Sequence, residues 1–110
     1  MDTSAIDQRV VAGLTGIVRR SVARLEALAA LPPESFAADA DCYAIAEHHL
    51  RLGLEASMDL GRHLIARLGL GAATDYSSVP RSLESAQIVP PELAATLMRS
   101  ARLRNRLVHL

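Results

Sequence analysis

The chain has few of the residues that staple small proteins or build sheets. Cys42 is its only cysteine, so an intramolecular disulfide is excluded. Tryptophan and lysine are absent, and the aromatic residues are one phenylalanine and two tyrosines. β-Branched and aromatic side chains suit the pleated surface of a sheet, whereas the abundant Ala and Leu favour helices. The composition therefore predicts an all-α protein.

Long hydrophobic runs are also missing. Charged residues or histidine interrupt every apolar stretch, and none approaches the roughly 20 residues needed to cross a bilayer. The N-terminus lacks a basic stretch followed by an apolar one, so no secretion signal is visible. Half of the 110 residues are apolar, which is enough for one core. We expect a single domain over residues 1–110, cytoplasmic and without membrane contact.

The charge is unevenly distributed, although the net charge is zero. Residues 1–98 hold eight arginines and twelve acidic residues, whereas residues 99–110 hold four arginines and no acidic residue. A local basic cluster on an acidic body can attract an anionic ligand to one place, whereas nonspecific binding of nucleic acid needs a broader basic surface. The pattern favours one anion-binding site rather than a nonspecific nucleic-acid-binding surface.

Hydrophobic periodicity, prolines and glycines divide the chain into helices. Ser4 resembles the start of a capping box for a first long helix, which should end before Pro32 because the residue before a proline avoids the helical region. Further helices are expected over residues 34–38, 41–68, 78–86 and 91–110. No stop signal follows the last helix, which predicts a helix that continues past Leu110 and a chain truncated at its C-terminal end.

Candidate chemistry lies in this last helix. Arg104 and His109 are five residues apart, or about 140° around the helix, whereas Asn105 and His109 are four apart and share a face. Asn105 is therefore expected to orient the imidazole. Arg102 and Arg106 lie on the same side and complete a polar strip, with Arg104 at its flank.

These residue types suit cleavage of a phosphodiester without a metal. The reaction needs a group that moves a proton near neutral pH, which histidine does. It also needs a permanent positive charge, and arginine can hold a phosphate bidentately and stabilise its transition state. The plainer interpretation is a basic helix end that complements its own dipole. From spacing alone this plainer interpretation is favoured, because arginine and histidine often occur together.

The string Arg104-Asn105-Arg106-Leu107-Val108-His109 resembles the Arg-x4-His motif of HEPN-domain ribonucleases, in the form seen in HepT-like toxins. Segments 43–46, 59–65 and 89–94 are similar to the same group. The resemblance implies a HEPN four-helix bundle with short extra helices, forming a homodimer in which two motifs face a shared cleft. It also implies metal-independent cleavage of RNA by the toxin of a type VII toxin–antitoxin pair.

The resemblance also implies roles for single residues. Arg104 would bind and stabilise the phosphate, His109 would act as general base or acid, and Asn105 is the polar residue that follows the arginine. Arg102 and Arg106 are our own additions, as RNA-binding residues. The implied partner is a minimal nucleotidyltransferase antitoxin, and no cofactor is implied.

The chain departs from the group in one respect. The group usually shows Arg-x4-His-x-Tyr, and the tyrosine, which the antitoxin adenylylates, would fall one position beyond Leu110. This departure keeps a second hypothesis open, a non-catalytic helical interaction module that binds a nucleotidyltransferase. A nucleotide-binding regulator is a third.

Two patterns in segment 41–68 receive structural interpretations. Glu55, Asp59 and His63 share a helix face, but a di-metal bundle needs Glu-x-x-His on two helices and none is present, so we expect Asp59 to pair with Arg62 or His63 instead. The small residues at four-residue spacing are expected to allow close helix packing, inside the bundle or across a dimer interface. These small residues are Gly53, Ser57 and Gly61.

Overall fold

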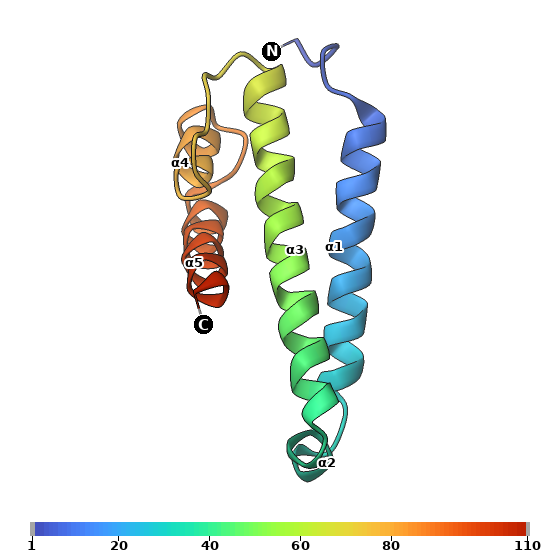
Figure 1. Cartoon of the computed structure of the whole chain (residues 1–110). Coiled ribbons are helices and arrows are strands. Elements are labelled where there is room, and N and C mark those ends of the chain that lie inside the picture. The colour runs from blue at the N-terminus through green and yellow to red at the C-terminus, as the bar shows by residue number, and fades with distance from the viewer. Residues whose placement is uncertain (1, 110) are drawn as a thin grey trace.

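The computed structural model describes residues 2–109, which form helices and no strand. The five helices are α1 (Gln8–Ala29), α2 (Pro33–Ala38), α3 (Ala40–Arg67), α4 (Ser78–Ser85) and α5 (Pro91–Val108). α1 and α3 form a long antiparallel hairpin that α2 closes at one end, and α4 and α5 pack on α3 (Figure 1). The all-α prediction is confirmed. α1, α3, α4 and α5 make up the bundle, and α2 is a short extra helix.

The first helix begins later than the capping-box pattern indicated. The Asp7 carboxylate, not Ser4, caps α1, because its Oδ1 accepts a hydrogen bond of 2.9 Å from the Arg9 N–H. Ser4 lies in a turn, where its own N–H donates to Asp2 Oδ1 at 2.9 Å. The Asp7 N–H donates to His63 Nε2 of α3 at 3.1 Å. The capping prediction for Ser4 is therefore wrong, and the start of α1 is fixed by a contact with a distant helix.

The other helix ends follow the glycine and proline signals more closely. α3 ends before Gly69, whose φ of 69° lets the Leu70 N–H donate back to the Ile65 carbonyl at 2.9 Å. α5 ends at Val108, and the His109 N–H donates to the Arg106 carbonyl at 3.1 Å in a tightened last turn. The prediction of a helix running through His109 is thus wrong by one residue, and Leu110 lies outside the described residues.

The buried core lies where α3, α4 and α5 meet. Its fully enclosed side chains come from all three helices, and half-buried residues of the connections, Tyr76 among them, pack around it. At the opposite end, Phe36 of α2, the only phenylalanine, is half-buried beside an apolar hollow between α1 and α3. The enclosed core side chains are Met58, Ile65, Val79, Leu83 and Ala101.

The glycines of α3 serve packing inside the bundle, as expected. A Cβ on Gly53 would lie 3.2 Å from Ser21 Cβ of α1. A Cβ on Gly61 would overlap Val79 of α4 and lie 3.2 Å from Leu83 Cδ1. Gly61 therefore lets α4 lie directly against the backbone of α3.

Within the described residues, no helix is both long and apolar enough to traverse a bilayer.

We predict that Gly61→Ala destabilises the protein by about 1–3 kcal/mol, because the added methyl group forces α4 away from α3. Gly13→Ala in α1 is the matched control, since nothing lies within 4 Å of its added Cβ. That control should gain about 0.5–1 kcal/mol from helix propensity. Urea unfolding followed by circular dichroism measures both, and equal effects of the two substitutions would contradict the close approach.

Candidate active site

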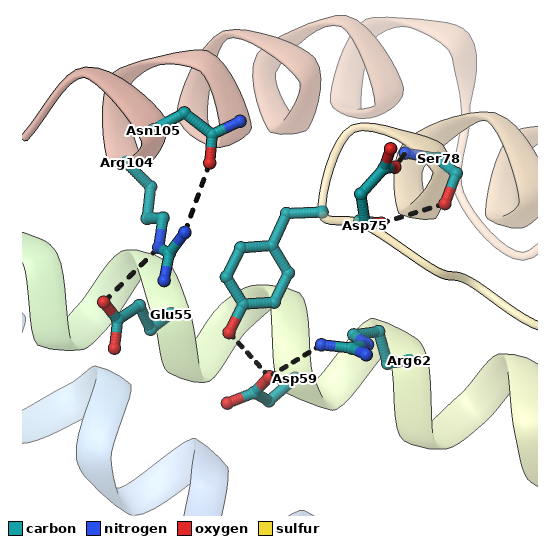
Figure 2. Close-up of polar contacts among 8 residues, drawn as sticks. Glu55, Asp59, Arg62, Asp75, Ser78, Arg104 and Asn105 are labelled. Atoms are coloured by element: carbon teal, nitrogen blue, oxygen red, sulfur yellow. Dashed lines mark hydrogen bonds and ion pairs between the residues drawn. The ribbon is translucent and has the colours of Figure 1, made fainter. Parts of the chain in front are cut away.

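Arg104 of α5 points inward, toward α3, and is held there by two hydrogen bonds (Figure 2). Its Nε donates to Glu55 Oε1 at 3.4 Å, and the two side chains are 27% and 30% exposed. Its Nη1 donates to the side-chain oxygen of the neighbouring Asn105 at 3.3 Å. The guanidinium is thus half-buried and oriented by contacts within the chain.

Tyr76, in the connection between α3 and α4, supports the same guanidinium. Arg104 Cζ lies 4.7 Å from the centroid of the Tyr76 ring, close enough for a cation–π interaction. The Tyr76 hydroxyl donates to Asp59 Oδ1 of α3 at 2.9 Å. Burial, followed by the hydrogen bond and charge of Asp59, raises the pKa of Tyr76 above its ordinary value of 10.0. The phenol therefore stays protonated and keeps its bond to Asp59.

Arg62 completes the cluster on the other side. Its Nη1 lies 4.0 Å from Asp59 Oδ1, and its Cζ lies 5.5 Å from the Tyr76 ring centroid. The predicted pairing of Asp59 with Arg62 is confirmed. The three residues considered for a di-metal site have separate hydrogen-bond partners. Glu55 accepts a hydrogen bond from Arg104, Asp59 accepts one from Tyr76, and His63 accepts one from the Asp7 backbone N–H.

The loop before α4 is held in place by Asp75. Its Oδ1 accepts hydrogen bonds of 3.0 Å from the Ser77 hydroxyl and from the Ser78 N–H. These bonds, the one from Ser77 first, lower the pKa of the Asp75 carboxyl below its ordinary value. The Ser78 hydroxyl donates back to the Asp75 carbonyl at 2.9 Å, as Figure 2 shows. Tyr76 therefore projects from a fixed turn.

An open pocket of about 290 Å³ lies beside this cluster. It is bounded by α5 on one side and by α3 and the loop before α4 on the other. Its rim brings together two residues of the motif and four residues that the sequence pattern did not connect with the motif. The lining residues are Arg62, Thr74, Asp75, Tyr76, Arg104 and Asn105.

The remaining residues singled out from the sequence lie on the exposed side of α5. Arg102, Arg106 and His109 are all exposed, as the helical spacing predicts. Within residues 2–109 the His109 ring makes no hydrogen bond, so the expected contact with Asn105 is not formed, and the Asn105 side-chain oxygen accepts from Arg104. The structure thus brings Arg104 and Asn105 together and leaves the imidazole in solvent.

Tyr76 is the residue that sequence reasoning missed. Its sequence neighbours show only a polar loop before a short helix, and its partners Asp59 and Arg104 lie 17 and 28 positions away. The one signal in the sequence was that tyrosine is rare, because the chain has only two tyrosines. The second tyrosine, Tyr43, is 61% exposed.

The fold and the motif together define an all-α helical bundle with an arginine on its last helix and a histidine at the end of that helix. The model of the HepT-like ribonuclease family matches residues 18–110, and the chain belongs to this family. Its architecture is accordingly a HEPN-type bundle. The chain is similar to a tRNA nuclease HepT of Aphanizomenon flos-aquae (strain 2012/KM1/D3), with 37% identity over 65 residues. That match covers 59% of the chain and 44% of the relative.

We predict that the contribution of Tyr76 to stability disappears at high pH. Because its pKa is raised in the fold, the neutral phenol stabilises the protein fully below about pH 10, and ionisation beside Asp59 removes this contribution as pH rises further. Tyr76→Phe should cost about 0.5–1.5 kcal/mol at pH 8 and less at pH 11. Urea unfolding at both pH values tests this, with Tyr43→Phe as control, and a cost that grows with pH would refute it.

Proposed function

We propose that the protein is a toxin-type, metal-independent endoribonuclease of a type VII toxin–antitoxin system, acting in the cytoplasm. Two copies form a cleft to which each contributes Arg104, Asn105 and His109. The observation that carries this proposal is the oriented, half-buried Arg104 at the rim of an open pocket, in a chain that belongs to a ribonuclease family. The curated relative is named a tRNA nuclease, so we propose tRNA as the substrate class.

The chemistry assigns each group one task. Glu55 and Asn105 occupy Nε and Nη1 of Arg104, which leaves the outer N–H groups to bind the scissile phosphate and to stabilise the charge that grows on its oxygens. His109 takes the proton from a ribose 2′-hydroxyl, whose oxygen attacks phosphorus. The bond from phosphorus to the 5′-oxygen breaks, which leaves a 2′,3′-cyclic phosphate on one product. The departing 5′-oxygen takes a proton from water, and the protonated His109 then releases its own proton to solvent. No metal is needed for any of these steps.

Substrate binding falls to the exposed face of α5. Arg102 and Arg106 are one helical turn apart and exposed, so both can contact backbone phosphates outside the pocket. Such contacts hold RNA in place without reading its sequence. The cognate partner in this proposal is a minimal nucleotidyltransferase antitoxin, as in the HepT-like group.

We predict that His109→Ala and Arg104→Ala each lower RNA cleavage by about 100-fold or more while the helical content is kept. The assay uses labelled tRNA in EDTA and separates products on a denaturing gel. A 2′-O-methyl RNA, which lacks the nucleophilic hydroxyl, should not be cut. Undiminished cleavage by both alanine variants, or cleavage that EDTA abolishes, would contradict the mechanism.

We predict that Arg102→Gln and Arg106→Gln weaken RNA binding without removing cleavage. Each lost phosphate contact should lower the slope of log affinity against log salt by about 0.7–0.9. Fluorescence anisotropy at several salt concentrations gives this slope. Arg24→Gln is the matched control, because it removes the same charge from an exposed position on α1. Equal slopes for all three variants would show that RNA does not follow α5.

A second candidate is a non-catalytic module that binds a nucleotidyltransferase. The observation that favours it is the ion pair with Glu55, which partly neutralises Arg104. This candidate requires a stable complex with the nucleotidyltransferase and no RNA turnover. RNA cleavage that depends on His109 would exclude it.

A further inference from the structure

The position of the Arg104 guanidinium is set by more than its ion pair. An arginine side chain has several rotatable bonds, and one 3.4 Å contact between partly exposed groups cannot fix its plane. The Tyr76 ring supplies a further constraint, because its face attracts the guanidinium, whose Cζ lies 4.7 Å from the ring centroid. Together with the hydrogen bond to Asn105, these contacts define where the outer N–H groups point.

The ring itself is held from two sides. Its hydroxyl is bound by Asp59 at 2.9 Å, and its body packs against the buried core formed by α3, α4 and α5. The preceding Asp75 is fixed to the first turn of α4 by hydrogen bonds with Ser77 and Ser78. Tyr76 therefore cannot move without disturbing the loop, and it transmits the position of α3 and α4 to a side chain of α5.

We propose that Tyr76 is a positioning residue for the reaction: its ring sets the orientation in which Arg104 meets the scissile phosphate. This role rests on the proposed function. The ring touches neither substrate nor reacting atoms, and it acts through the arginine. Because the contact of Arg104 with the phosphate strengthens as charge grows in the transition state, a misplaced guanidinium lowers kcat. RNA affinity changes little, because it rests mainly on the exposed arginines of α5.

The hydroxyl and the ring have separable parts in this role. Phenylalanine keeps the face on which Arg104 lies and loses only the bond to Asp59. Leucine keeps an apolar body against the core but has no aromatic face. A purely structural residue would lose stability and activity in parallel, whereas a positioning residue loses kcat in a protein that still folds and binds RNA.

The test compares Tyr76→Phe, Tyr76→Leu and the control Tyr43→Leu in the full chain. Steady-state cleavage of labelled tRNA gives kcat, anisotropy with a 2′-O-methyl RNA gives affinity, and thermal unfolding checks the fold. We expect Tyr76→Leu to lose about tenfold or more in kcat with affinity within about twofold, and Tyr76→Phe to keep at least about a third of kcat. Tyr43→Leu should match the wild type. If Tyr76→Leu does not fold, Tyr76→Met replaces it as an apolar variant of similar length.

Three results would overturn the role of Tyr76. These are full kcat in a folded Tyr76→Leu, an equal loss in Tyr76→Phe and Tyr76→Leu, and a loss of RNA affinity that accounts for the whole effect. A wild-type protein that binds RNA but does not cut it would overturn the proposed function and this role together. An active wild type with an unimpaired Tyr76→Leu would overturn the role alone.

Discussion

The close approach of α4 to α3 at Gly61 is the constraint on which the site depends. A side chain at this position would meet Val79 and Leu83, so α4 would have to move outward. Val79 is three residues after Tyr76, and the fixed turn between them carries any movement of α4 to the ring. α5 packs against both α3 and α4, so the distance between Arg104 and its supports follows from the same contact. The packing of α3, α4 and α5 thus determines the geometry of the candidate site.

The polar cluster contributes orientation more than stability. The ion pairs of Arg104 with Glu55 and of Arg62 with Asp59 are partly exposed, and such pairs contribute little free energy because solvent screens them. The Tyr76 ring nevertheless joins the two pairs, because its centroid lies 4.7 Å from Arg104 Cζ and 5.5 Å from Arg62 Cζ. Each charge is compensated locally, so the arginine can stay half-buried. An anionic substrate must then compete with Glu55 for Arg104 only at the edge of the guanidinium that faces the substrate.

The sequence predicted what depends on neighbours in the chain and missed what depends on distant contacts. Periodicity, prolines and glycines placed all five helices, and the spacing of Gly53 and Gly61 predicted close packing. The start of α1 was misplaced because Asp7 is fixed by a histidine 56 positions away. For the site, spacing placed the exposed strip of α5 correctly. It paired Asn105 with His109, whereas the Asn105 side-chain oxygen accepts from Arg104, the residue before it in the chain.

The separation of Arg104 from the imidazole bears on how the proposed enzyme works. A base must come within hydrogen-bond reach of the proton that it removes. Within one chain, Arg104 faces α3 while His109 is exposed about 140° further around α5. A phosphate held at the pocket rim therefore approaches an imidazole more easily if that imidazole belongs to a second copy facing the first. In the proposed dimer, Glu55 and Tyr76 of each copy keep the arginine in place, and association of the copies supplies the base.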